Sequence, residues 1–266
     1  MRFLLSLLLS LSFLPTHAQT TTERDFKKHF DAHGISGSFL LYDLKADRYL
    51  AYDVARCRKG FMPASTFKIP NTIIGLDTGV LPDTNYVFKW DGKPKWLKAW
   101  ETDMNLAQAM RVSCVPCYQE VARKVGVERY KTWLTKMNYE HMDVGVANVD
   151  SFWLEGRSHI SQFEQIAFLK RLFLNQLPVS RRSMDLTKAL ILLKATPEYT
   201  LRGKTGLSNA AQNRAHYNGW IVGWLERGDN TYFFALNAEH IGTDNSRFIP
   251  ARRAITEAIL REMGLM

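Results

Sequence analysis

Residues 61–71 read FMPASTFKIPN and place Ser65 and Lys68 three positions apart in a mostly apolar stretch. If a helix begins at or just after Ser65, this i,i+3 spacing sets the lysine amine beside the serine hydroxyl on one helix face. Ser65 would then lie at the amino end of the helix, where free backbone N–H groups and the helix dipole favour developing negative charge. One of these N–H groups could act as an oxyanion donor. The stretch therefore predicts a serine nucleophile with a base beside it.

A lysine serves as a base only if its pKa falls well below the ordinary value of about 10.4. Burial among apolar groups can lower a lysine pKa by about 3–5 units, and Phe61, Met62, Phe67 and Ile69 offer such surroundings. A neutral amine is also the form that reacts with carbon dioxide to give a carbamate, which is a better base. Because Ser-x-x-Lys spacing is common on solvated helix surfaces, the interpretation depends on the rest of the chain.

Residues 1–18 have the pattern of a secretory signal. Arg2 supplies the charged start, residues 3–14 the apolar core, and residues 16–18 (THA) the small-residue cleavage site. This run is too short to span a membrane, and no other segment approaches about 18 uninterrupted apolar residues. We therefore expect an exported protein without a membrane span, located in the bacterial periplasm.

The formal net charge is +9, but the basic residues are scattered and form no run of five or more. Such a pattern favours a solvated basic surface over a nucleic-acid interface, so no nucleic-acid partner is expected. A basic surface also suits a small anionic substrate, which it can steer electrostatically.

The three cysteines are Cys57, Cys114 and Cys117, and an odd number forbids complete pairing within the chain. Cys114 and Cys117 have CxxC spacing, but no second pair completes a zinc site. Packed free thiols and one local bridge both remain open. His29 and His33 are four residues apart without the glutamate of a zinc-protease motif, so no metal site is expected.

The sequence predicts strands toward both ends of the chain and mainly helices in the middle. Helices are expected at 23–33, 65–76, 106–126, 128–137, 161–174, 183–194 and 250–263, and strands at 37–43, 48–52, 199–204, 219–226 and 231–239. An irregular loop covers 139–158, Ser161 and Glu164 form a capping box, and residues 227–230 (RGDN) form a hairpin turn.

This order predicts an α+β fold. An antiparallel sheet is built from both ends of the chain and flanked by terminal helices, with a helical lobe inserted. We expect one catalytic domain over 19–266, with a sheet lobe over about 19–60 and 196–266 and a helical lobe over about 61–195.

Three further features bear on the serine and lysine. Ser113 supplies a second hydroxyl in the helical lobe, with Val115 two residues on; residues 204–206 (KTG) end a strand; and Trp153 lies in the irregular loop. In a strand, a glycine permits close approach of a ligand, and an adjacent lysine and hydroxyl suit a carboxylate. Each feature alone is ordinary, but their combination indicates one site.

The motifs PASTFK (63–68), SCV (113–115), DSFWL (150–154), KTG (204–206) and GWIVGW (219–224) together resemble the class D (oxacillinase-type) serine β-lactamases. The resemblance covers residues 19–266. It implies the fold shared by serine β-lactamases and penicillin-binding proteins. It also implies hydrolysis of the β-lactam amide through a serine acyl-enzyme, which confers antibiotic resistance, with a small-molecule β-lactam as partner.

The resemblance makes Ser65 the nucleophile and Lys68 an N6-carboxylysine that is general base in acylation and deacylation. Carbon dioxide or bicarbonate is then needed, with no other cofactor and no metal. Val115, Phe67 and Leu154 match apolar residues that keep the carbamate dry, and Trp153 matches the indole that donates to it.

The remaining implied roles concern the substrate. Ser113 matches the hydroxyl that relays a proton to the leaving nitrogen, and Lys204 matches the lysine that holds the local electrostatics. The residues matched to substrate binding are Thr205, Gly206, Leu207 and Arg252, with Arg253 as a competitor, and Trp100 is expected in the wall of the cleft. The backbone N–H groups of Ser65 and Leu207 match the oxyanion hole.

One stretch departs from the family. Tyr139-Glu140-His141 stands where Tyr-Gly-Asn is usual, and the segment from there to Trp153 is one residue longer. A glutamate in place of a glycine predicts an altered loop if that position needs positive φ. His141 is expected to face solvent, with a role in the active site as the alternative.

Two other functions stay open at the level of sequence. One is a β-lactam sensor or penicillin-binding relative that is acylated without turnover. The other is a peptidase that acts on cell-wall stem peptides. The preferred class of β-lactam and the oligomeric state, monomer or homodimer, are undecided.

Overall fold

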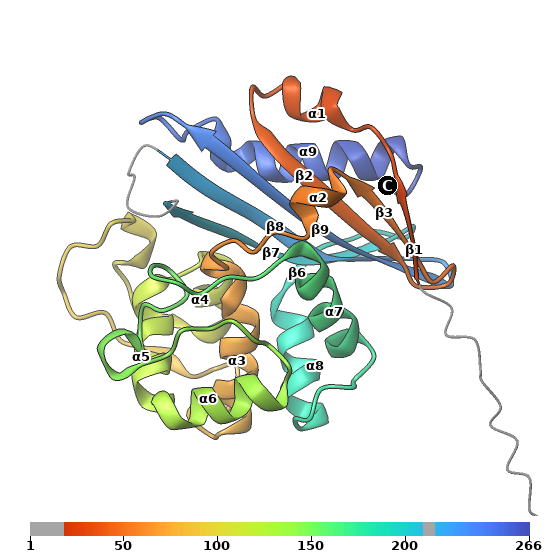
Figure 1. Ribbon diagram of the computed structural model, residues 1–266. Helices are drawn as coiled ribbons and strands as arrows, with labels where there is room; N and C mark the ends of the chain where they lie inside the picture. The colour runs from red at the N-terminus through yellow and green to blue at the C-terminus, as the bar shows by residue number, and fades with distance from the viewer. Residues whose placement is uncertain (1–18, 210–215) are drawn as a thin grey trace, which may run out of the picture.

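The computed structural model describes residues 19–209 and 216–266, in which a seven-stranded sheet carries helices on both faces (Figure 1). Its strands are β1 (Thr20–Glu23), β2 (Ser36–Asp43), β3 (Arg48–Tyr52), β6 (Leu192–Ala195), β7 (Thr200–Asn209), β8 (His216–Arg227) and β9 (Asn230–Ile241). The order across the sheet is β1-β3-β2-β9-β8-β7-β6, so strands from the two ends of the chain meet at β2 and β9. The expected α+β fold is confirmed.

Helices fill most of the middle of the chain. They are α1 (Lys27–Asp31), α2 (Val54–Cys57), α3 (Lys68–Asp77), α4 (Leu106–Arg111), α5 (Val115–Val125), α6 (Val127–Lys136), α7 (Gln162–Phe173), α8 (Arg181–Leu190) and α9 (Phe248–Glu262). Three 3₁₀ turns are η1 (Ala64–Phe67), η2 (Lys98–Trp100) and η3 (Val146–Asn148), and β4 (Val87–Phe88) pairs with β5 (Met104–Asn105).

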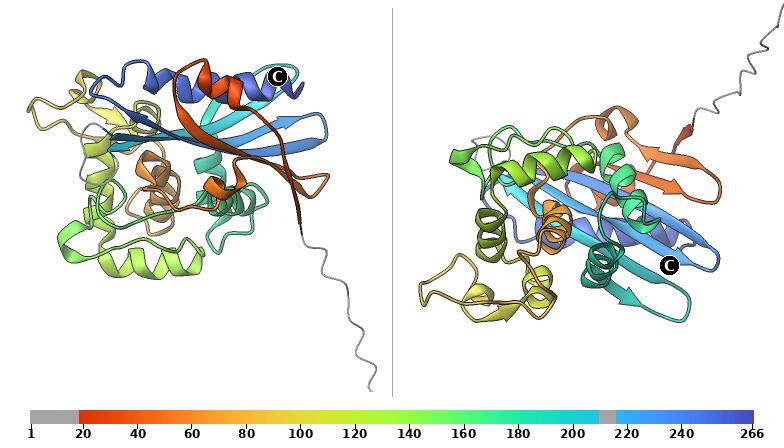
Figure 2. Two further views of the ribbon diagram at one scale, coloured as in Figure 1. Left: turned by 45° about the horizontal axis from the view of Figure 1, so that its top comes forward. Right: turned by 90° about the horizontal axis from the view of Figure 1, so that it is seen from below.

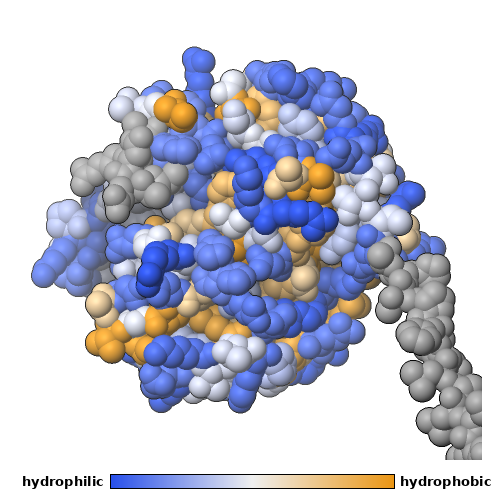
Figure 3. Space-filling model, in the orientation of Figure 1, coloured by the Kyte–Doolittle hydropathy of each residue, from blue (hydrophilic) through white to orange (hydrophobic). Residues whose placement is uncertain are grey.

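The sheet separates two hydrophobic cores. Figure 2 shows α1 and α9 on one face and the other large helices on the opposite face. Side chains alternate along β9, so Phe234 and Leu236 pack toward α9 while Phe233 and Ala235 pack toward the helical lobe. On the face seen in Figure 3 the surface is mostly hydrophilic, with apolar residues in small separate patches.

Several predicted elements are confirmed because their signals are local. β2 and β3 form the predicted hairpin, and β8 and β9 are joined at the predicted turn, where Gly228 takes φ 57°. Helix α7 begins at the Ser161 cap, and Ser161 and Glu164 make the predicted capping box.

Four expectations were wrong in part. The helix expected over 23–33 is only α1, and residue 23 belongs instead to β1, which pairs with β3 in parallel rather than antiparallel. The helix expected over 106–126 breaks at 112–114, where Ser113 takes φ 55° and Pro116 opens the next helix. The helix expected over 183–194 ends at Leu190, and residues 192–195 pair with β7. The stretch from Ser65 begins as the 3₁₀ turn η1 and becomes α-helical only at Lys68.

Two expectations concern membranes and export. Among the described residues, no helix is long and apolar enough to cross a membrane. The expected signal segment, residues 1–18, lies outside the described residues.

We predict that Gly223→Ala destabilises the fold. Gly223 faces Gly203 across β7 and β8, and a Cβ at Gly223 would collide with the Arg202 carbonyl oxygen, which belongs to the backbone and cannot move aside. Overpacking of this kind costs about 1–3 kcal/mol, and a domain of this size loses about 2–4 °C of Tm per kcal/mol. Calorimetry measures the shift.

The matched control is Gly145→Ala, where the new Cβ would lie 3.5 Å from Asn148 Oδ1, an ordinary contact. An unchanged Tm in Gly223→Ala would show that the two strands can separate without loss.

Candidate active site

Ser65 and Lys68 lie at the junction of η1 and α3, where the structure brings them together. Lys68 Nζ donates to Ser65 Oγ at 2.9 Å, and the Lys68 side chain is fully buried. Burial, and then the charge of Lys204, hold the Lys68 pKa well below its usual range. Burial therefore favours the neutral amine, which is the form that can accept a proton.

The turn that carries Ser65 is tied down on both sides. Thr66 Oγ1 donates to the Pro63 carbonyl at 2.7 Å and accepts from Gln165 Nε2 at 2.8 Å, which fixes η1 to α7. Ala64 takes φ 51°, an uncommon conformation for a residue with a side chain. These contacts hold the serine in place against a locally unfavourable backbone.

Strand β7 passes directly beside η1. A Cβ at Gly206 would lie 3.1 Å from the Pro63 carbonyl oxygen, so a glycine allows the strand to come this close. On the same strand, Lys204 Nζ donates to Ser113 Oγ at 3.0 Å and to the Thr205 carbonyl at 3.0 Å. Burial, and then the charge of Arg252, lower the Lys204 pKa to about 7.

Arg252 reaches the same strand from α9. Its side chain is buried, and its guanidinium donates to the Gly206 carbonyl and, at 3.1 Å, to the Ile249 carbonyl. Gly219 makes room for it, since a Cβ there would lie 2.6 Å from Arg252 Cδ. Arg253 instead lies on the exposed face of α9 and pairs with Glu257 at 2.6 Å. Of the two adjacent arginines, only Arg252 lies at the strand.

Three buried basic side chains thus converge without an acidic counterpart. Burial lowers the pKa of Lys68, of Lys204 and of Arg252 (to about 10), and no carboxylate of the described residues raises any of the three. Buried charges in proteins are normally paired. The arrangement favours an anionic ligand.

Trp153 adds a buried polar atom without a partner among the described residues. Its indole is fully buried, lies 5.6 Å from the Phe67 ring in a stacked arrangement and meets Phe152 edge-on at 5.0 Å. Its Nε1 has no hydrogen-bond partner within the part of the chain that the structure describes. Because a buried N–H without a partner is costly, this atom fits an acceptor group introduced beside Phe67 and Lys68.

The unusual segment 139–141 closes the Trp153 loop rather than entering the site. The positive φ falls on His141 (63°), and Glu140 does not need a left-handed conformation. The His141 ring stacks on His159 at 4.8 Å, its Nε2 lies 3.3 Å from Glu164 Oε1, and its carbonyl accepts from the His159 N–H at 3.1 Å. Residue 140 therefore does not meet the condition under which an altered loop was predicted, and the His141 side chain is about half exposed, at 46%.

The Trp153 loop is held both by core packing and by contacts where the loop closes. Trp153 packs on Phe67 and Phe152 inside the core, whereas His141 stacks on His159 where the loop closes. Tyr139 connects the two regions, since it is buried and meets the Phe67 ring edge-on at 5.8 Å.

A groove of about 680 Å³ opens beside the catalytic cluster, on residues next to Ser113 and Lys204 rather than on these side chains themselves. Val115, Leu154, Leu207 and Trp100, all predicted as site residues, contribute to its walls. Trp96 also lines it, is 73% exposed and packs edge-on against Trp100 at 5.8 Å. From the tryptophans of residues 87–100, one or two of which were expected to line a cleft, the sequence prediction assigned Trp100 to the site and not Trp96.

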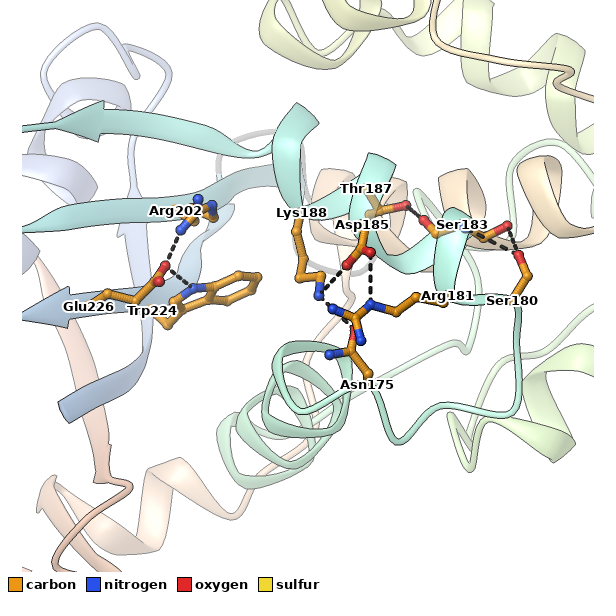
Figure 4. Close-up of polar contacts among 10 residues, drawn as sticks. All are labelled: Asn175, Ser180, Arg181, Ser183, Asp185, Thr187, Lys188, Arg202, Trp224 and Glu226. Atoms are coloured by element: carbon orange, nitrogen blue, oxygen red, sulfur yellow. Dashed lines mark hydrogen bonds and ion pairs between the residues drawn. The ribbon is translucent and has the colours of Figure 1, made fainter. Parts of the chain in front are cut away.

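A second polar cluster lies between α8 and the sheet (Figure 4). There Glu226 accepts from Arg202 and, at 3.0 Å, from Trp224 Nε1, while Lys188 pairs with Asp185 at 2.7 Å. These residues line a cavity of about 300 Å³ that shares no residue with the groove. Because its charges are paired with one another, the cluster has a structural character.

The chain is similar over most of its length to known proteins. The sequence profile of the family described as "Penicillin binding protein transpeptidase domain" matches residues 22–261. β-Lactamase OXA-5 of Pseudomonas aeruginosa is 40% identical over 241 residues, which cover 91% of this chain and 89% of OXA-5. β-Lactamase OXA-48 of Klebsiella pneumoniae is 39% identical over 257 residues, which cover 96% of this chain and 94% of OXA-48.

Solved structures agree with these relatives. A class D β-lactamase from Nostoc superposes with a TM-score of 0.85 at 38% identity, covering 91% of this chain and 99% of its own. A class D β-lactamase from Sebaldella termitidis gives a TM-score of 0.87 at 32% identity, covering 93% of this chain and 99% of its own.

We predict that Lys68→Met stabilises the protein in buffer free of carbon dioxide, where the Lys68 amine is not carboxylated. Methionine has a similar length and removes the buried amine, so Tm at pH 7 should rise by about 2–4 °C for each kcal/mol of relieved desolvation. The folded-state pKa of Lys68 lies below its unfolded value, so between these values the unfolded chain binds one more proton and the amine destabilises the fold increasingly as pH falls. The gain in Lys68→Met should therefore be larger at pH 6 than at pH 9.

Lys59→Met is the matched control, because Lys59 is exposed and should show no such trend. A Lys68→Met gain that is independent of pH, or a loss of stability, would contradict a neutral buried amine.

Proposed function

The chain belongs to the class D serine β-lactamases, and we propose that it hydrolyses β-lactams through Ser65, with an N-carboxylated Lys68 as general base. The family assignment makes it a serine hydrolase of β-lactam antibiotics that confers resistance to them. The finer assignments of residues to steps rest on the geometry of the site.

The proposal for ring opening starts from the Ser65 hydroxyl. Carboxylated Lys68 would take the hydroxyl proton while the Ser65 oxygen bonds to the carbonyl carbon of the β-lactam; the C–N bond then breaks, and the leaving nitrogen needs a proton of its own. Ser113 Oγ can donate that proton and regain one from Lys204 Nζ, since these two atoms are 3.0 Å apart. The backbone N–H groups of Ser65 and Leu207 are proposed to stabilise the oxyanion.

The second step, hydrolysis of the acyl-enzyme, requires a base that survives acylation. A carboxyl group on Lys68 Nζ would supply such a base. The neutral buried amine of Lys68 and the unpaired Nε1 of Trp153 support this assignment, because the first can take up carbon dioxide and the second can donate to the product. Phe67, Val115 and Leu154 are proposed to keep the pocket dry.

Substrate binding is proposed to use the charge and shape of the groove. The carboxylate of a β-lactam suits Arg252 with Thr205 and the Gly206 segment of β7, near Lys204. The acyl side chain suits the apolar walls at Trp96, Trp100 and Leu207.

The observation that carries the proposal is the buried Lys68 amine, 2.9 Å from Ser65 Oγ and without an acidic partner among the described residues. A sensor or penicillin-binding relative that is acylated without turnover is the weaker alternative, because OXA-5 and OXA-48 are β-lactamases. We also propose that residues 1–18 direct export to the periplasm and that residues 19–266 form one catalytic domain. Within it, a sheet lobe of about 19–60 and 196–266 would enclose a helical lobe of about 61–195.

The first test mixes purified residues 19–266 with benzylpenicillin and measures, over time, the intact mass of the protein and the amount of hydrolysed product. We expect a transient adduct on Ser65 and many equivalents of hydrolysed product, because the site has a base for both steps. A persistent adduct with about one equivalent consumed would favour the sensor. Ser65→Ala should form neither adduct nor product.

Trp153→Phe tests the role of the indole N–H. Phenylalanine keeps aromatic packing on Phe67 but removes the Nε1 donor, so carboxylation of Lys68 should weaken and deacylation should slow by about 10-fold or more. Added bicarbonate should restore part of the rate. ¹³C NMR with labelled bicarbonate measures the carbamate on Lys68 independently of turnover.

Trp224→Phe is the matched control. Trp224 is equally buried, but its Nε1 has a partner in Glu226, in the separate cluster of Figure 4. If Trp153→Phe kept a full carbamate signal and a normal deacylation rate, the proposed donor role would be wrong.

A further inference from the structure

A disulfide joins Cys114 and Cys117 across the first turn of α5, directly after Ser113. Both cysteines are buried, at 1% and 6% exposure, whereas Cys57 is a buried free thiol. The proposed reaction uses neither sulfur. The role of the bond therefore lies in the segment of chain that it holds in place.

The turn between α4 and α5 has an unfavourable backbone. Ser113 takes φ 55°, a left-handed conformation that sets Cβ too close to the backbone in a residue with a side chain. The turn is closed by backbone bonds from Ser113 to Met110 (3.2 Å) and from Cys114 to Ala109 (2.9 Å). In this conformation Ser113 Oγ lies 3.0 Å from Lys204 Nζ, and a relaxed turn would carry the hydroxyl away.

Two restraints flank Ser113. On its amino side, Trp100 Nε1 donates to the Val112 carbonyl at 3.1 Å. On its carboxyl side, Cys114 is the cap of α5, since its Sγ accepts from the Cys117 N–H at 3.2 Å, and the disulfide closes the same turn covalently. The first turn of α5 therefore cannot unwind away from Ser113 while the bond is intact.

We propose that the Cys114–Cys117 disulfide is a positioning cross-link for Ser113, so that β-lactam hydrolysis depends on the oxidation state of this pair. The inference rests on the proposed role of Ser113 in ring opening. Two electrons and two protons convert the disulfide into two thiols, and the left-handed turn then loses its covalent support. An exported protein would normally meet the oxidising conditions that keep the bond formed.

A double-mutant cycle separates positioning from simple stabilisation. Its four proteins are the wild type, Cys114→Ala/Cys117→Val, Ser113→Ala and the combined variant. Loss of the disulfide should lower kcat/KM for benzylpenicillin, which reports acylation, by about tenfold when Ser113 is present, because small misplacements of a catalytic group have effects of this size. It should have no further effect when residue 113 is alanine. Tm should fall equally in both backgrounds, and deacylation of preformed acyl-enzyme should stay unchanged.

Chemical reduction of the wild type tests the same disulfide without any mutation. Tris(carboxyethyl)phosphine breaks the S–S bond and is oxidised to its oxide with oxygen from water, leaving two thiols. Thiol titration after unfolding should count one thiol, Cys57, before treatment and all three cysteines afterwards. kcat/KM should fall by the same factor and recover on reoxidation, and Cys57→Ala should respond in the same way.

Full activity of the enzyme with all thiols reduced would overturn the inference, as would equal losses of kcat/KM in both Ser113 backgrounds. An oxidised wild type that does not hydrolyse benzylpenicillin at all would overturn the proposed function and this inference with it. An enzyme that hydrolyses benzylpenicillin equally well before and after reduction of the disulfide would overturn this inference and leave the proposed function standing.

Discussion

The structure depends on the burial of one amine, that of Lys68, which has no carboxylate among the described residues to balance it. Removing such a group from water is unfavourable, so the amine is held neutral and the surrounding fold bears the cost. Two cores, one on each face of the sheet, supply the compensating burial of apolar surface. The same desolvation that weakens the fold gives Lys68 the reactivity that its proposed role requires.

Several backbone positions around this amine are unfavourable or tightly packed. Ala64 and Ser113 take positive φ, and Gly206 and Gly219 have no space for a side chain. Strain of this kind persists only where the surroundings determine the conformation, and it gathers at functional sites. Here η1 is held by its hydrogen bond to α7, and the Ser113 turn is held by Trp100 and the disulfide.

The sequence by itself determined the local features. The Ser65–Lys68 pair, the hairpin of β2 and β3 and the Ser161 cap all follow from spacings of a few residues, which propensity and hydrogen bonding decide. The break at Ser113 was missed although Pro116 signalled it, because apolar spacing continues through the turn. The family motifs also joined residues that are distant in the sequence into one predicted site.

Only the tertiary structure decided the long-range features. It placed Arg252 against the sheet, where Gly219 leaves room for its side chain, and turned the chemically equivalent Arg253 toward Glu257 on the exposed face of α9. It also decided that residues 192–195 pair with β7 and that β1 runs parallel to β3. It placed Trp96 in the wall of the groove and left the Trp153 Nε1 without a partner among the described residues. Spacing along the chain fixes which side chains share a turn or a face, whereas contacts between remote segments depend on how whole layers pack.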